Sequence, residues 1–178
     1  ELVRRGQTER LPQILETIEE RTRHLERFIL GYARFAKLPA PQVQEVDWPA
    51  FLAQLQAHAR FELDGPQPAE TARFDAAQME QALLNLLKNA HESGSAPEAV
   101  TLACRASRGE LVLVVSDRGP GMSETVLAQA LLPFYSTKRA GTGLGLALAR
   151  EIVEAHGGRI ALVNRRGGGL RVTLSLPQ

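Results

Sequence analysis

Residues 75–90 read DAAQMEQALLNLLKNA. Asp75 precedes apolar residues with helical spacing, which predicts a helix that Asp75 caps. The expected inner face of this helix consists of apolar side chains, namely Met79, Leu83, Leu86, Leu87 and Ala90. Asn85 and Asn89 are four residues apart, so on a helix they share one face, opposite the leucines. Two carboxamides directed into one cleft can ligate a hard cation through oxygen or bond a phosphate through nitrogen. The alternative interpretation is two asparagines on a solvated face.

The segments around this helix alternate between strands and helices. Further helices are expected from Asp47 to about residue 59, from Ser123, and over about residues 143–156. Strands are expected at residues 60–63, 71–74, 99–107 and 110–116, and on both sides of the glycine turn at 167–169. This order predicts an α/β fold, a two-layer sandwich of a mixed, mainly antiparallel sheet and three helices.

A long helical pattern precedes the sandwich, over residues 10–37. Its apolar positions alternate by three and four, with Arg21 in the same seam: Leu11, Ile14, Ile18, Arg21, Leu25, Phe28, Tyr32 and Phe35. The helix should end at Leu38 because Pro39 disfavours a helical conformation in the preceding residue. A lone helix cannot bury such a stripe, so we expect a bundle-forming helix that needs a partner.

The composition limits the general function classes. The chain has 178 residues, of which 44% are hydrophobic and 23% charged, and its formal net charge is +1. This balance predicts no general attraction to nucleic acid or to an anionic membrane. The single cysteine, Cys104, excludes an internal disulfide framework and is expected to be a buried thiol in a reducing compartment. No apolar run approaches the ~20 residues of a membrane span. Because the chain begins at Glu1 within a pattern, we expect a piece of a longer protein, with any membrane span outside this piece.

Three further segments carry candidate functional residues. Asp117-Arg-Gly-Pro-Gly121-Met follows an apolar strand, where a carboxylate can accept a hydrogen bond from an amino group such as that of adenine, although ordinary turns have similar sequences. Pro133-Phe-Tyr-Ser-Thr-Lys138 offers hydroxyls and a cation, or alternatively an aromatic residue that anchors a surface loop. Gly141-Thr-Gly-Leu-Gly145-Leu leads into a helix, whose N-terminal N–H groups favour phosphate.

In chain order, residues 85–90 and these three segments resemble the N, G1, F and G2 boxes of sensor histidine kinases, respectively. That family belongs to the wider ATPase group that includes gyrase, heat-shock chaperones and mismatch-repair ATPases. The similarity covers residues 43–178 and extends to Glu151–Ile160 and the final Leu176-Pro177. It implies a catalytic ATP-binding kinase domain at residues 43–178. Residues 1–40 then resemble part of the dimerisation and histidine-phosphotransfer hairpin, mainly its second helix.

The resemblance implies a Bergerat-type site for ATP and Mg²⁺. Asn89 would hold the magnesium ion, Asn85 would lie beside the phosphates, and Asp117 would bind the adenine amino group. Gly119 and Gly121 would shape the adenine pocket. The implied lid over the phosphates consists of Lys138, Arg139, Gly141, Thr142, Gly143, Leu144 and Gly145. Asn85 and Lys138 are the candidate catalytic residues.

The same resemblance implies partners and a location. It predicts a response regulator receiver domain as partner and a homodimer formed through the hairpin in the full protein. The location would be cytoplasmic, with anchoring in the inner membrane only through other segments.

Three departures from the family pattern are visible. The acceptor signature is a histidine followed by an acidic residue, with Asn or Thr and then Pro a few positions on, and none of His24, His58, His91 and His156 has that setting. The acceptor is therefore expected outside this chain. Only two residues separate Lys138 from Gly141, which resembles the short lid of nitrogen-regulation-type kinases. Leu170 stands where relatives often carry threonine, which places one polar contact near the adenine in doubt.

Two other functions stay open beside the histidine kinase. One is a hydrolytic ATPase clamp of the same group. Those relatives use a glutamate at the position of Asn85, and a carboxamide cannot act as a general base. The other is a non-catalytic nucleotide-binding module that acts through protein contacts.

Overall fold

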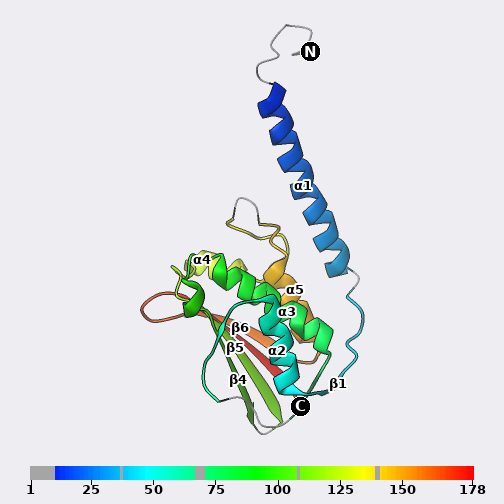
Figure 1. The fold of residues 1–178 in the computed structure, drawn as a ribbon, viewed down its shortest axis with the longest axis vertical. Coiled ribbons are helices and arrows are strands. Elements are labelled where there is room, and N and C mark those ends of the chain that lie inside the picture. Colours follow the sequence, from blue (N-terminus) through cyan, green and yellow to red (C-terminus); the bar gives the residue numbers. More distant parts are fainter. Residues whose placement is uncertain (1–10, 37, 67–70, 108, 139–140) are drawn as a thin grey trace.

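A five-stranded sheet forms one layer of the protein (Figure 1). The computed structural model describes residues 11–36, 38–66, 71–107, 109–138 and 141–178. The strand order is β2-β4-β5-β7-β6, with bounds β2 Glu62–Leu63, β4 Thr101–Ser107, β5 Glu110–Ser116, β6 Arg159–Asn164 and β7 Leu170–Pro177. The β2–β4 pair is parallel, and the other three pairs are antiparallel. The predicted mixed, mainly antiparallel sheet is confirmed.

Three helices pack on this sheet: α2 Trp48–His58, α3 Ala76–His91 and α5 Gly145–Ala155. Two of them begin at the predicted aspartate caps. The Ala50 N–H donates to the Asp47 carboxylate at 3.1 Å, and the Gln78 N–H donates to Asp75 at 3.0 Å. Because such caps satisfy N–H groups that have no partner within the helix, the sequence determines where α2 and α3 start. A short helix, α4 Glu124–Gln129, follows the Ser123 cap.

The core lies between the helices and one face of the sheet. Alternate residues of β7 are buried in it, namely Leu170, Val172, Leu174 and Leu176. Trp48 is also buried, stacked on Phe51 with ring centroids 5.6 Å apart. Cys104 is a core thiol as predicted, and burial raises its pKa to about 12. Since the thiolate is the reactive form, this cysteine is a packing residue.

Two expected strands form but do not pair with each other. Residues 72–74 (β3, Ala72–Phe74) pair antiparallel with β1, Gln44–Val46, in a separate two-stranded sheet, whereas β2 joins the main sheet. A second difference is at Ala99, which we expected to begin a strand. It lies instead in a 3-10 helix, η2 Pro97–Ala99, and Pro97 in the first turn explains this start.

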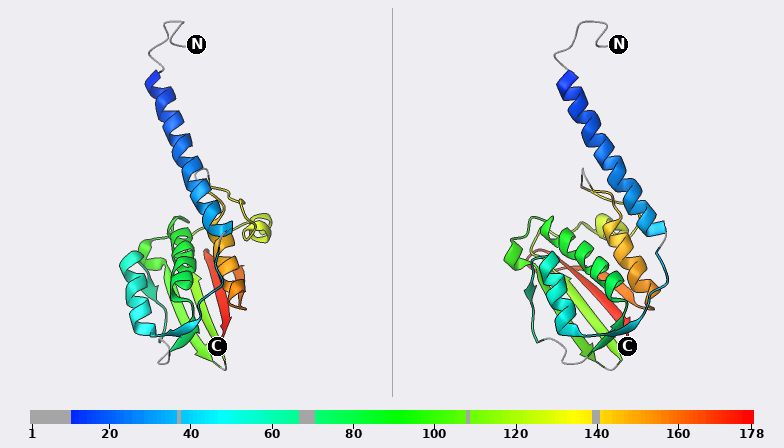
Figure 2. Two further views of the ribbon diagram at one scale, coloured as in Figure 1. Left: turned by 90° about the vertical axis from the view of Figure 1, so that its right-hand side faces the viewer. Right: turned by 45° about the vertical axis from the view of Figure 1, so that its right-hand side comes forward.

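The long helix α1, Leu11–Ala36, projects away from the sandwich (Figure 2). Large apolar side chains of this helix, including three from the predicted seam, are at least half exposed: Leu15, Ile18, Leu25, Ile29 and Tyr32. Near its C-terminal end, the Tyr32 ring lies 6.2 Å from the Phe134 ring of the F box. Within the described residues, no helix has the length and apolarity that a membrane crossing requires.

Candidate functional site

The two asparagines of the N box face the first residue of α5. A Cβ atom added at Gly145 would lie 3.7 Å from Asn89 Nδ2 and 3.8 Å from Asn85 Oδ1. Both asparagines are half-buried, while Leu86 and Leu87 on the same helix are buried in the core. The structure therefore contradicts the solvated-face interpretation and brings the N box against the G2 box.

The N-terminus of α5 has no side-chain cap, because Leu144 occupies the cap position. Leu144 itself is buried, so its side chain packs instead of facing the cleft. Uncapped N–H groups at a helix start carry partial positive charge and favour an anion. The asparagine pair and this helix start together form a polar end of the site.

Asp117 lies at the other end of the site, directly after β5. It is 5% exposed, and its Oδ1 accepts hydrogen bonds from the N–H groups of Gly119 (2.8 Å) and Leu170 (3.2 Å). Within the part of the chain that the structure describes, no hydrogen bond reaches its second oxygen, Oδ2. The carboxylate is thus held by one oxygen and can accept through the other.

Leu170, one of the three departures from the family pattern, has no polar side chain to offer near Asp117. Its side chain is buried in the core, and the polar contact with Asp117 comes from its backbone N–H. Since this bond is independent of the side chain, leucine in place of threonine does not remove it.

The G1 loop, residues 117–122, is fastened to its surroundings by side chains from elsewhere. The Met122 N–H donates to Asn164 Oδ1 at 2.9 Å, and Asn164 Nδ2 donates to the Met122 carbonyl at 2.6 Å. The Arg118 N–H donates to Ser95 Oγ at 2.9 Å. Each of these bonds fixes the loop backbone, so the loop is rigidly placed beside Asp117.

The glycines of this loop are required by close contacts. A Cβ at Gly119 would collide with Ser93, and one at Gly121, where φ is +75°, would lie 2.7 Å from Asn164 Oδ1. Side chains at these positions would displace the loop, because such separations are shorter than van der Waals contact allows. Both predicted glycines therefore shape the site through packing.

Gly169 also shapes the site through packing, and it was not predicted as a site residue. Its φ is +98°, and an added Cβ would collide with the backbone of Asp117. The Arg165 guanidinium beside it donates to the Asp117 carbonyl at 2.7 Å. The sequence signal was the Gly167–Gly169 turn, which was interpreted only as a connection between strands.

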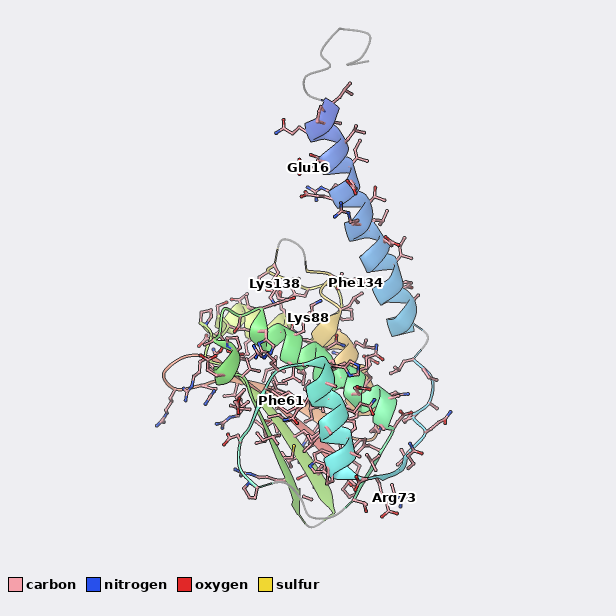
Figure 3. The ribbon with its side chains drawn as sticks, in the orientation of Figure 1. Glu16, Phe61, Arg73, Lys88, Phe134 and Lys138 are labelled. Carbon is pink, nitrogen blue, oxygen red and sulfur yellow. The ribbon has the colours of Figure 1, made fainter. Side chains whose placement is uncertain are left out.

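The described part of the lid, residues 136–138 and 141–145, is joined to α3 by an ion pair. Lys138 Nζ lies 2.6 Å from a carboxylate oxygen of Glu92, the residue at the C-terminal cap of α3. Figure 3 shows Lys138 over the side of α3 that carries Lys88, which is 3.8 Å from the other Glu92 oxygen. Glu92 was not predicted from the sequence. Arg139 lies outside the described residues.

The lid is joined tightly to the F box at Gly143. The Phe134 N–H donates to the Gly143 carbonyl at 3.0 Å, and a Cβ at Gly143, where φ is +69°, would collide with Phe134. Gly141 packs in the same way on Ser136, and Thr142 is half-buried beside them. Phe134 itself has a φ of +67°, a conformation that costs a non-glycine residue about 1–2 kcal/mol. The base of the lid is therefore compact and strained.

These features define a class of protein. A two-layer sandwich with a buried carboxylate directly after a central strand and an asparagine pair beside an uncapped helix start is typical of a nucleotide-binding α/β domain. Residues 74–178 match the family described as histidine kinase-, DNA gyrase B- and HSP90-like ATPases. The chain belongs to this family.

Relatives among known proteins are sensor kinases. Nitrogen regulation protein NtrY of Azorhizobium caulinodans is 32% identical over 179 residues, covering 91% of this chain and 23% of the relative. Signal transduction histidine-protein kinase AfsQ2 of Streptomyces coelicolor is 36% identical over 181 residues, covering 97% and 32%. The chain spans about a quarter to a third of the length of these relatives.

Solved structures show the same fold. Full-length ShkA in complex with AMPPNP superposes with a TM-score of 0.72 at 24% identity, covering 93% of this chain and 37% of that one. The catalytic domain of histidine kinase ThkA gives 0.64 at 25% identity, covering 76% and 95%. These likenesses confirm the predicted fold. The family match and the curated relatives confirm the predicted sensor histidine kinase type.

Proposed function

We propose that this chain binds ATP with Mg²⁺ and donates the γ-phosphoryl group to a histidine outside the chain. An aspartate of a response regulator would then take the phosphoryl group. The main observation in support of the proposal is that Asn85 and Asn89 lie close to the uncapped start of α5. The name of the relative AfsQ2, a signal transduction histidine-protein kinase, supports it.

The donor atoms of the asparagine pair fit a magnesium site. Magnesium is bound in proteins by a few oxygen ligands together with substrate phosphates, and the half-buried carboxamides supply such oxygens. We assign Asn89 to the ion and Asn85 to the phosphates. A bound ion would neutralise phosphate charge, which phosphoryl transfer needs along with correct positioning.

We assign the adenine to Asp117 and the phosphates to the lid. The Oδ2 atom of Asp117 would accept from the adenine amino group, while Oδ1 keeps the G1 loop in position. Lys138 must exchange its bond with Glu92 for one with phosphate. Asn85 cannot take a proton from water as a general base does, so we expect slow hydrolysis.

Titration calorimetry with ATP, in the presence and absence of Mg²⁺, tests the binding. Wild-type affinity should fall when Mg²⁺ is withdrawn, whereas Asn89→Ala should bind with the same low affinity in both conditions. Gln56→Ala, which removes an exposed carboxamide from α2, is the matched control and should behave as wild type. No binding of ATP or ADP at millimolar concentration would refute the assignment.

Incubation with γ-labelled ATP, followed by electrophoresis under alkaline conditions, tests the transfer. The chain alone should acquire no acid-labile label on His24, His58, His91 or His156. The full-length protein should acquire one on another histidine. Label on His24 would place the acceptor within this chain, and fast hydrolysis without label would favour the ATPase clamp.

We further propose that α1 belongs to a helical hairpin that forms a homodimer in the full protein, on the cytoplasmic side of any membrane anchor. The exposed apolar stripe of α1 supports this proposal, since burial of such side chains drives association. Sedimentation equilibrium of the full-length protein should show a dimer that Ile18→Glu dissociates. An unchanged dimer would exclude this stripe as the contact.

A further inference from the structure

Four arginines surround one hollow at the end of the sheet where β6 turns into β7. The hollow has a volume of about 370 Å³, and its lining residues are Arg118, Val163, Asn164, Arg165, Arg166 and Arg171. The turn projects from the sheet and is drawn in orange in Figure 1. The arginines come from three segments, namely the G1 loop, the β6–β7 turn and β7. Residues far apart in the sequence thus converge on one concave surface.

This hollow lies on the face of the sheet opposite the helices. Leu170 and Val172 are buried in the core beneath the helices, so Arg171 between them points to the other face. Val163 pairs with Arg171 in the β6–β7 register and is exposed on that same face. The hollow is therefore separate from the asparagine pair and the start of α5.

The charges of Arg118 and Arg171 act on the guanidinium group of Arg165. Burial lowers the pKa of Arg165 below its usual range, and the charges of Arg118 and Arg171 lower it further. Asp117 and Asp64 act in the opposite direction. Within the described residues, none of the four arginines forms an ion pair. In a chain of net charge +1, this is a local excess of positive charge that a bound anion would relieve.

The geometry favours a phosphate-bearing anion of small size. Guanidinium groups match the oxygens of phosphate in bidentate pairs, and the hollow has the volume of a small-molecule site. Arg165 is already oriented, because its Nη1 atom donates to the Asp117 carbonyl. We propose that this hollow is a second anion site, distinct from the nucleotide pocket, for a small ligand that carries two or more phosphate groups.

Inorganic pyrophosphate is the probe, titrated calorimetrically into the protein with and without saturating ADP and Mg²⁺. We expect binding in both conditions. Arg118→Gln and Arg171→Gln should each weaken it about tenfold, since each removes one charge-assisted contact. Arg105→Gln is the matched control, an exposed arginine on the same face at the far end of β4, and should leave binding unchanged. Circular dichroism melting verifies that the variants fold.

Four results would overturn the proposal. Competition by ADP would assign the pyrophosphate to the nucleotide pocket. Equal binding of pyrophosphate by the wild type and the arginine variants would exclude the hollow as a site. So would the absence of binding at about 10 mM pyrophosphate, a concentration at which even weak small-ligand sites bind. Tighter binding of a hexaglutamate peptide than of pyrophosphate would instead indicate a surface for acidic protein segments. The titration without ADP tests the hollow even if the nucleotide assignment fails.

Discussion

The G1 loop and the lid are held in place differently. The G1 loop is bonded through its backbone to Asn164 and Ser95, and Asp117 is bonded to two further N–H groups. The lid, by contrast, is held to α3 through one side-chain ion pair, in which Lys138 and Glu92 are each 41% exposed. Exposed ion pairs contribute little, about 0–1 kcal/mol. The base-binding end is therefore preformed, and the phosphate-binding end can rearrange when a ligand arrives.

The largest expected effect comes from filling the space beneath Asp117. Gly169→Ala combines a positive φ with a collision against the Asp117 backbone, and should lower the free energy of unfolding by about 3–5 kcal/mol. Gly167→Ala has the same sign of φ but only the Arg118 side chain within 4 Å, and should cost about 1–2 kcal/mol. Urea unfolding measures both. Equal losses would show that the collision is relieved by movement of the loop.

Asp117→Asn should change which base is bound while preserving the loop. The asparagine carbonyl can still accept from Gly119 and Leu170, but the atom facing the ligand becomes a donor. ADP affinity should fall about 100-fold, or about 2.8 kcal/mol, and GDP affinity should fall less because guanine presents a carbonyl there. Calorimetry with both nucleotides tests this, with Asp64→Asn as the control. A similar loss for GDP and ADP would indicate damage to the loop instead.

The substitution Asn164→Ala should loosen the G1 loop, although Asn164 is assigned no contact with the nucleotide. It removes both bonds to Met122 and should cost about 1–2 kcal/mol of stability. Hydrogen exchange at Gly121 and Met122 should become faster in the absence of nucleotide. Val163→Ala, an exposed neighbour on β6, should leave that exchange unchanged. Unaltered protection in Asn164→Ala would mean that the loop is stable without this bridge.

The smallest expected effect concerns the lid. Glu92→Gln removes the ion pair that nucleotide must otherwise break, so ADP affinity should rise about two- to threefold at low salt and converge with wild type at high salt. Hydrogen exchange at residues 136–138 and 141–145 should be fast without nucleotide and slow with it. Glu124→Gln, an exposed glutamate of α4, is the control. An affinity independent of Glu92 would show that the pair does not restrain the lid.

Local features of the site could be predicted from the sequence, whereas its supports could not. The asparagine pair and the aspartate caps depend on neighbours within one turn of helix, so their spacing was sufficient. Asn164 acts on Met122 from 42 positions away, and Glu92 acts on Lys138 from 46. No local spacing indicates such contacts. The strands β2 and β3 illustrate the same limit, because their pattern predicts extended backbone but not which strand each will pair with.

The contact between Tyr32 and Phe134 makes the lid sensitive to the orientation of α1 about its own axis. An α-helix has 3.6 residues per turn, so a rotation by one residue position is about 100°. The residues on either side of Tyr32 are Gly31 and Ala33, which carry no large side chain. A turn of that size in either direction moves the Tyr32 ring away from Phe134 and brings one of these small residues to its angular position. The contact at the base of the lid is thus made in one rotational position of α1 and is lost when the helix turns by one residue position in either direction.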